Sequence, residues 1–144
     1  MTAEPRQVEQ RAAAAGFVAG EFVRPEDVPT PMAVWKPIIR IGAEPSVRIP
    51  DSADDRIGTT WLRLARGNGT IGADGALLLS VGGAGELPWL WVTIGAEDPD
   101  VGRLSLDGFE PEFVAIAVDG RAHCAVTSEE YETWIFASPA VDAG

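Results

Sequence analysis

The chain has 144 residues, a formal net charge of −11 and 46% hydrophobic residues. A chain of this length fits a single domain and can bury a sizeable core without a metal ion or a disulfide. Its single cysteine, Cys124, excludes an intramolecular disulfide. The acidic surplus argues against a nucleic-acid partner, because such binding usually needs a basic patch. No apolar run approaches the roughly 20 residues of a transmembrane helix, so we expect no membrane partner.

The first segment, Pro5–Ala15, is predicted to form a short helix. Proline is favourable in a first turn, and glutamine, glutamate, arginine and consecutive alanines are good helix formers. No basic stretch followed by an apolar one is visible before this segment. We therefore expect a cytoplasmic location, or a place within an assembled particle.

Residues 17–31 are predicted to form an extended arm. Prolines at positions 25, 29 and 31 exclude a long helix and favour an extended or polyproline conformation. The arm also carries apolar side chains that a plain linker would lack, namely Phe17, Val18, Phe22 and Val23. We therefore divide the chain into a helix and docking arm over residues 1–31 and a β-rich domain over residues 32–144. The arm packs either on its own domain or on a neighbouring subunit.

From Met32 onward the sequence pattern indicates short strands separated by Gly, Asp and Pro. A strand at Ala33–Ile41 is expected at a sheet edge, because Pro37 cannot donate a ladder hydrogen bond. The segment Asp51–Arg56 is expected to be a polar loop. The other strands predicted before the central hairpin are Ser46–Ile49, Thr59–Arg66, Ala76–Gly82, Pro88–Gly95 and Val101–Leu106.

The strongest local signal is the pair Asp119-Gly120, which joins two apolar runs. Both residue types tolerate positive φ, so the pair predicts a hairpin with a type I′ turn. A two-residue turn places Ile116 opposite His123. Both faces of this hairpin are largely apolar, which indicates a central position in the sheet or an interface.

The tail, Thr127–Ala137, fits two structures. Thr127 and Glu130 match a helix capping box, and Tyr131 and Trp134 then lie on one helical face. The alternating pattern of the same residues also fits a strand.

These elements predict an all-β domain, either a sandwich or a partly closed barrel of about eight short, mainly antiparallel strands. A short N-terminal helix and an extended Pro-rich arm precede it. No long helix is expected between successive strands, which disfavours a parallel α/β sheet.

His123 and Cys124 are the one pair of a nucleophile and a base worth testing. Neighbours on a strand point to opposite faces of the sheet, so these side chains cannot form a Cys–His dyad. The chain has no second histidine. We expect both residues to be structural, and we expect no catalytic residue.

Three groups of acidic residues are candidates for metal binding or for acid–base chemistry. They are Asp51, Asp54 and Asp55; Glu97, Asp98 and Asp100; and Glu110 with Glu112. No group has the spacing of an EF-hand loop, and no second feature marks a cleft for paired carboxylates. Acidic residues clustered in loops are usually solvated, so we expect no metal and no cofactor.

Trp89 and Trp91 share one face of a predicted strand, opposite an aliphatic stripe. If the aliphatic residues face the core, the two indoles form a binding surface. The alternative is that a second sheet or the N-terminal arm covers them.

The sequence favours a non-enzymatic protein that binds protein partners or assembles with itself, such as a structural subunit of a phage virion. Its expected partner-binding residues are Phe17, Val18, Phe22, Val23, Trp89 and Trp91. Two alternatives stay open. One is a small-ligand-binding β-barrel, or an enzyme built in one. The other is an acidic immunity-type inhibitor of a basic protein.

Overall fold

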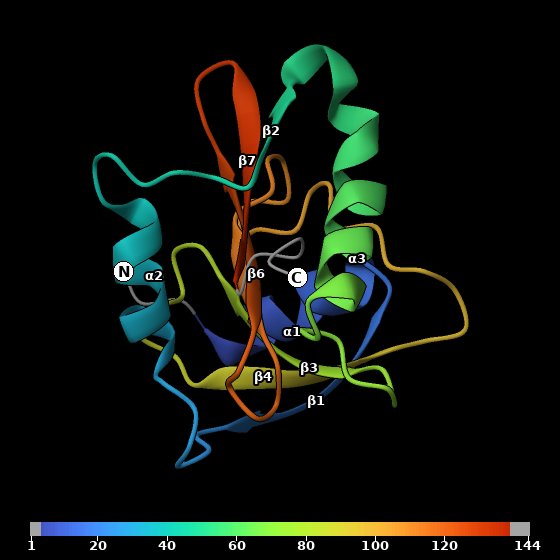
Figure 1. The fold of residues 1–144 in the computed structure, drawn as a ribbon. Helices are drawn as coiled ribbons and strands as arrows, with labels where there is room; N and C mark the ends of the chain where they lie inside the picture. The colour runs from blue at the N-terminus through green and yellow to red at the C-terminus, as the bar shows by residue number, and fades with distance from the viewer. Residues whose placement is uncertain (1–3, 139–144) are drawn as a thin grey trace.

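The computed structural model describes residues 4–138, in which one antiparallel sheet of seven strands dominates (Figure 1). The order across the sheet is β1-β4-β3-β5-β6-β7-β2, so β1 and β2 are its edges. The predicted antiparallel β architecture is confirmed. The strands are β1 (Phe17–Val23), β2 (Val47–Pro50), β3 (Ala76–Val81), β4 (Trp89–Ile94), β5 (Phe113–Ile116), β6 (His123–Ser128) and β7 (Glu132–Ser138).

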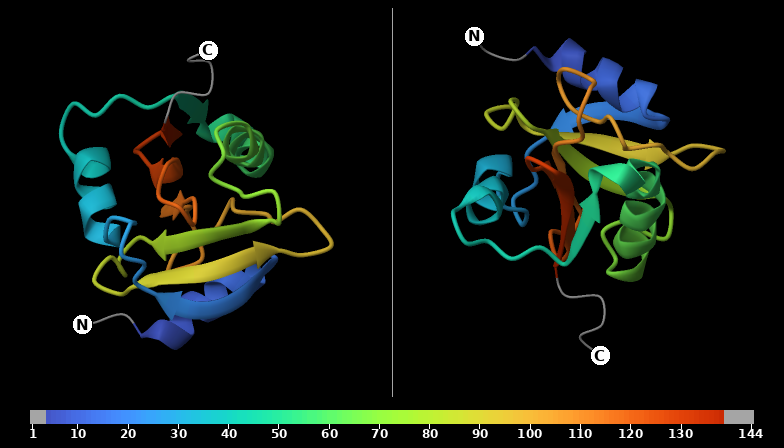
Figure 2. Two further views of the ribbon diagram at one scale, coloured as in Figure 1. Left: turned by 60° about the horizontal axis from the view of Figure 1, so that its bottom comes forward. Right: turned by 90° about the horizontal axis from the view of Figure 1, so that it is seen from above.

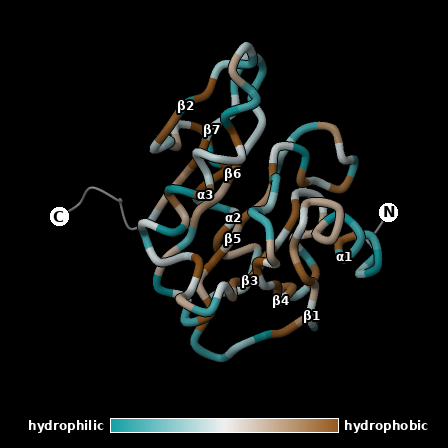
Figure 3. Tube along the Cα trace, turned by 90° about the vertical axis from the view of Figure 1, so that its right-hand side faces the viewer, coloured by the Kyte–Doolittle hydropathy of each residue, from teal (hydrophilic) through white to brown (hydrophobic). Residues whose placement is uncertain are grey.

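The sheet is strongly twisted, so that β1, β4 and β3 run across the direction of β6 and β7 (Figure 1 and Figure 2). Three α-helices and one 3-10 helix pack around it: α1 (Pro5–Ala14), α2 (Pro31–Ile39), η1 (Asp51–Arg56) and α3 (Ile57–Gly67). Hydropathy follows this arrangement, because hydrophobic residues gather along the central strands (Figure 3). Within residues 4–138, no helix is both long and apolar enough to cross a bilayer.

One face of the sheet packs against α1 and α3. The centre of this core is Trp61 of α3, whose ring meets Phe17 and Phe113 edge-on, with centroids 6.3 and 5.4 Å away. Its indole N–H donates to the carbonyl of Cys124 at 3.1 Å, so the buried donor has a partner. This core therefore joins the edge strand β1 to the middle of the sheet.

The opposite face packs against α2. Trp35 of α2 and Trp89 of β4 are both buried there. The Trp35 indole donates to the Ser80 hydroxyl at 3.0 Å, and the Trp89 indole donates to the Pro29 carbonyl at 2.8 Å. Both faces of the central strands are thus covered, as the apolar hairpin indicated.

The strand predicted at Ala33–Ile41 is wrong, because this stretch forms α2. Thr30 caps the helix by accepting from the Ala33 N–H at 3.4 Å, and Pro31 follows at the first position. Pro37 removes one hydrogen bond near the end of a nine-residue helix. Burial of Val34, Trp35 and Ile38 against the sheet offsets that loss.

The strand predicted at Thr59–Arg66 is also wrong, because these residues lie in α3. Leu62 and Leu64 suggested a period of two. The buried residues Ile57, Trp61, Leu64 and Ala65 follow the helical period instead. The expected polar loop at Asp51–Arg56 is a 3-10 helix that leads into α3.

Other predictions have mixed outcomes. The strands predicted near residues 46–49, 76–82 and 88–95 are confirmed as β2, β3 and β4. The strand predicted at Val101–Leu106 is wrong, because this stretch is irregular and turns at residues 102–103, where the Leu104 N–H donates to the Val101 carbonyl at 3.1 Å. The tail is a strand, β7, paired with β6, so the helical interpretation is wrong.

The Asp119-Gly120 hairpin is confirmed in register, with Ile116 opposite His123. Its turn is not type I′, because only Gly120 has positive φ, at 77°. The Gly120 N–H donates to the Ala117 carbonyl at 2.8 Å, and the Asp119 carboxylate accepts from the Arg121 N–H at 3.0 Å. The Ala117 N–H donates to the Ala122 carbonyl at 2.8 Å, so the connection is a wider loop over residues 118–121 that contains one left-handed glycine.

The first half of the expected arm is β1, an edge strand that pairs with β4 of the same chain. Phe17 lies opposite Ile94, and Val23 lies opposite Trp89, with an irregularity between Ala19 and Phe22. The sheet therefore combines β1, from residues 1–31, with six strands from the part of the chain after residue 31.

Candidate functional site

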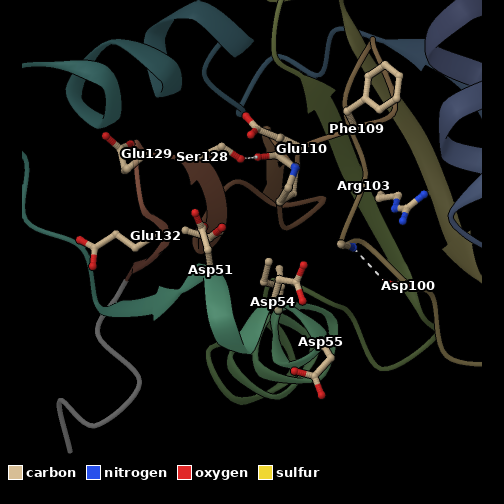
Figure 4. Close-up of a pocket in the computed structure, with 14 residues that line it drawn as sticks. Asp51, Asp54, Asp55, Asp100, Arg103, Phe109, Glu110, Ser128, Glu129 and Glu132 are labelled. Carbon is tan, nitrogen blue, oxygen red and sulfur yellow. Dashed lines mark hydrogen bonds between the residues drawn. The ribbon is translucent and has the colours of Figure 1, made fainter.

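The surface has a hollow of about 730 Å³, here called the acidic cleft (Figure 4). It lies where η1, the β6–β7 turn and the loop of residues 100–111 come together. Seven carboxylates line it, against a single arginine, Arg103. The carboxylates are those of Asp51, Asp54, Asp55, Asp100, Glu110, Glu129 and Glu132.

Backbone and side-chain hydrogen bonds hold the walls of the acidic cleft together. The Asp51 N–H donates to the Tyr131 carbonyl at 3.1 Å and ties η1 to the β6–β7 turn. The Ser128 hydroxyl donates to the Pro111 carbonyl at 2.7 Å and ties β6 to the loop before β5. The acidic segments therefore have fixed positions relative to one another.

Three of the seven carboxylates have partners within the protein. Glu132 accepts from the Trp134 indole at 2.6 Å and lies 3.4 Å from the guanidinium of Arg48. Glu129 accepts from the Thr127 hydroxyl at 2.8 Å, and Asp100 accepts from the Gly102 N–H at 3.0 Å. These contacts orient the carboxylates, but only Arg48 brings a compensating charge.

The other four carboxylates are those of Asp51, Asp54, Asp55 and Glu110. Their side chains make no hydrogen bond or ion pair with any residue in the described part of the chain. The three aspartates precede α3, whose N-terminal dipole favours negative charge nearby. Glu110 has no such support. The acidic cleft therefore holds a surplus of negative charge that a cationic ligand would neutralise.

Further carboxylates continue this charge beside the acidic cleft. Partial burial raises the pKa of Glu112, and neighbouring carboxylates, first of all Glu129, raise it further. The pKa of Asp107 is lowered instead, because the Phe109 N–H and the Ser105 hydroxyl both donate to it at 2.8 Å. Near neutral pH, a positive charge beside Glu112 would relieve the repulsion that this carboxylate experiences.

Among residues 4–138, no three His, Cys, Asp or Glu side chains lie close enough together to hold one metal ion. The carboxylates of the acidic cleft are instead spread around its walls, as Figure 4 shows. Such a spacing fits an extended cationic surface better than a single ion.

The residues expected from the sequence to bind a partner do not line the acidic cleft. Phe17 and Trp89 are 4% and 1% exposed, so both lie in the cores. Phe22 and Val23 are partly buried. Val18 and Trp91 are 57% and 37% exposed on the β1–β4 edge of the sheet, so two of the six residues are open to a partner there.

His123 and Cys124 stand apart from the acidic cleft. Cys124 is fully buried in the core beneath α3, and burial raises the pKa of its thiol to about 12. Desolvation lowers the pKa of His123. A thiol with so high a pKa is protonated at neutral pH and is a poor nucleophile.

The acidic cleft itself was missed by sequence reasoning, although most of its acidic residues were singled out. Asp51, Asp100 and Glu110 belonged to three separate groups, each expected to be an ordinary solvated loop. The fold brings members of all three groups to one hollow and adds Glu129 and Glu132 from the tail. The sequence signal was that several connecting segments are acidic. These segments form a site only because the fold places them at one end of the sheet.

Comparison with known proteins adds no relative: no protein-family model matches the chain, and no curated protein or solved structure matches it significantly.

Proposed function

We propose that this protein is a non-enzymatic interaction protein whose acidic cleft binds a basic segment of a partner protein. The observation that carries the proposal is the group of seven carboxylates around one hollow, four of them without a partner in the described chain. Unpaired charges in a concave site interact strongly with a complementary ligand and speed its approach. Phe109, which is 79% exposed beside these charges, adds apolar area for the same partner.

This proposal fits two of the roles expected from the sequence. An assembly subunit would receive the basic segment from a neighbouring subunit. An inhibitor of a basic protein would cover that segment. A cytoplasmic location, or one within an assembled particle, goes with either role. The small-ligand alternative has less support, because Trp61, Trp89, Trp91 and Trp134 line neither the acidic cleft nor four smaller hollows of the surface.

The test uses a fluorescein-labelled hexa-arginine peptide and two variants with the same net charge. The cleft variant, Asp51→Asn/Asp54→Asn/Asp55→Asn/Glu110→Gln, removes the unpaired carboxylates. The control variant, Glu9→Gln/Glu21→Gln/Glu26→Gln/Glu97→Gln, removes four exposed charges that lie outside the cleft. We expect fluorescence anisotropy at low salt to show about tenfold weaker binding by the cleft variant and little change in the control. Equal losses in both variants would mean attraction by net charge alone and would end the proposal.

Self-association is the second candidate function, because Val18 and Trp91 are exposed next to the open edge of β1. An unpaired strand edge with exposed apolar side chains is a template for pairing with another chain. Light scattering after size-exclusion chromatography tests it, since a monomer at high concentration contradicts self-assembly through this edge.

We also infer that the sheet is the partly closed barrel among the predicted alternatives rather than a sandwich. The support is that all seven strands follow one hydrogen-bonded order and twist through a large angle.

A further inference from the structure

The acidic cleft continues into two smaller hollows. A middle hollow of about 300 Å³ shares Glu110 and Ser128 with it. A third hollow of about 270 Å³ shares Gly82, Gly83 and Glu112 with the middle one. The three hollows form one path over the surface, here called the extended groove.

The far end of the extended groove is an apolar pocket formed by α2 and the loop between β3 and β4. Its apolar side chains are those of Met32, Trp35 and Ile39. Trp35 is buried, but Met32 and Ile39 are 41% and 61% exposed. A partner side chain of moderate size would remove this apolar area from water.

The loop 82–85 is the floor that connects the pocket to the acidic side. A Cβ atom on Gly82 would collide with the Glu112 carboxylate, and one on Gly83 would come 2.9 Å from Leu106. A Cβ atom on Gly85 would collide with the Met32 sulfur. Side chains from three segments therefore rest directly on this glycine loop, and the polar and apolar parts of the groove meet there.

Charge decides what kind of segment fits the extended groove. The middle hollow carries Asp107, Glu110 and Glu112 with no basic residue among its lining side chains. Partial burial raises the pKa of Glu112, and repulsion by Glu129, Asp107 and Glu110 raises it further. A second copy of this chain, with a net charge of −11, would add repulsion here. A cationic segment would remove it.

We propose that the extended groove binds a stretch of a partner protein in which basic residues lie next to one large apolar side chain. The basic residues occupy the acidic cleft and the middle hollow. The apolar side chain occupies the pocket between Met32 and Ile39. This inference rests on the proposed function and adds the apolar anchor to it.

The test compares three fluorescein-labelled peptides with the full chain. One is hexa-arginine, and the other two carry a leucine added at its N-terminal or C-terminal end. Ile39→Ser removes one wall of the pocket. Ile41→Ser is the matched control, because Ile41 is fully exposed two residues later and lines none of these hollows. Circular dichroism confirms that both variants keep the fold.

We expect at least one leucine-bearing peptide to bind roughly tenfold more tightly than hexa-arginine, in line with burial of one aliphatic side chain. Ile39→Ser should abolish most of this gain, whereas Ile41→Ser should retain it. If hexa-arginine binds but leucine adds nothing, or Ile39→Ser keeps the gain, the apolar anchor is wrong and the proposed function stands. If none of the peptides binds, the proposed function fails together with the anchor.

Discussion

Gly120 shows how one residue fixes the hairpin between β5 and β6. Its φ of 77° is in the left-handed region, and a Cβ atom there would meet the Asp27 carbonyl oxygen at 3.1 Å and the Val28 Cα at 3.3 Å. Both neighbours are backbone atoms of the segment that leads from β1 to α2. The glycine therefore serves the turn and also the close approach of a segment distant in sequence.

We predict that Gly120→Ala destabilises the protein by more than the conformational cost alone. Gly69→Ala is the control, because Gly69 has a φ of 87° with nothing within 4 Å of its Cβ position. That variant should lose about 1–2 kcal/mol from backbone strain. Gly120→Ala should lose clearly more in urea denaturation, because the segment 27–28 must also move. Equal losses would show that this contact is unimportant.

At the scale of elements, β1 decides whether the expected arm belongs to its own domain. Phe17 is 4% exposed and packs on Trp61, whereas Val18, on the other face of the strand, is 57% exposed. The alternation of one strand thus separates a core residue from a surface residue.

We predict opposite outcomes for these two neighbours. Phe17→Ala should cost about 3–5 kcal/mol of the free energy of unfolding, because it leaves a cavity beside Trp61. Val18→Ala should change it by no more than about 0.5 kcal/mol. Thermal and urea unfolding measure both. A small effect of Phe17→Ala would mean that β1 packs only loosely on its own domain. It would favour the alternative in which the arm packs on a neighbouring subunit.

The strands were predictable from sequence where alternation and glycine turns coincide, as in β3 and β4. The helices α2 and α3 were not, and the reasons differ. In α2, Thr30 and Pro31 form a helix start signal, but a strand was predicted there, with Pro37 placing it at a sheet edge. Tertiary burial of residues such as Trp35 offsets the hydrogen bond that Pro37 removes from the helix. In α3, the helical period begins at Ile57, before the alternating stretch that suggested a strand.

At the scale of the whole molecule, the candidate site could not be predicted because no local pattern encodes it. Asp54 and Glu110 are separated by more than fifty residues, and each is ordinary in its own loop. Only the strand order, which brings the β6–β7 turn beside η1, makes them neighbours across one hollow. The acidic composition is evident from the sequence, but the gathering of acidic side chains in one cleft depends on the topology of the sheet.

This concentration of charge predicts how stability responds to salt. The Debye length falls from about 30 Å at 0.01 M salt to about 8 Å at 0.15 M, so added salt weakens repulsion among exposed carboxylates. We therefore expect the melting temperature to rise between these two concentrations. The rise should be smaller in the cleft variant than in the control variant of equal net charge, because the cleft carboxylates line one hollow whereas the control residues come from separate segments. If the α3 dipole outweighed their mutual repulsion, salt would screen a favourable interaction at the three aspartates. The melting temperature of the cleft variant would then rise with salt at least as much as that of the control. The unpaired carboxylates would in that case stabilise the fold, and they would not be a destabilising surface that binding of a basic partner explains.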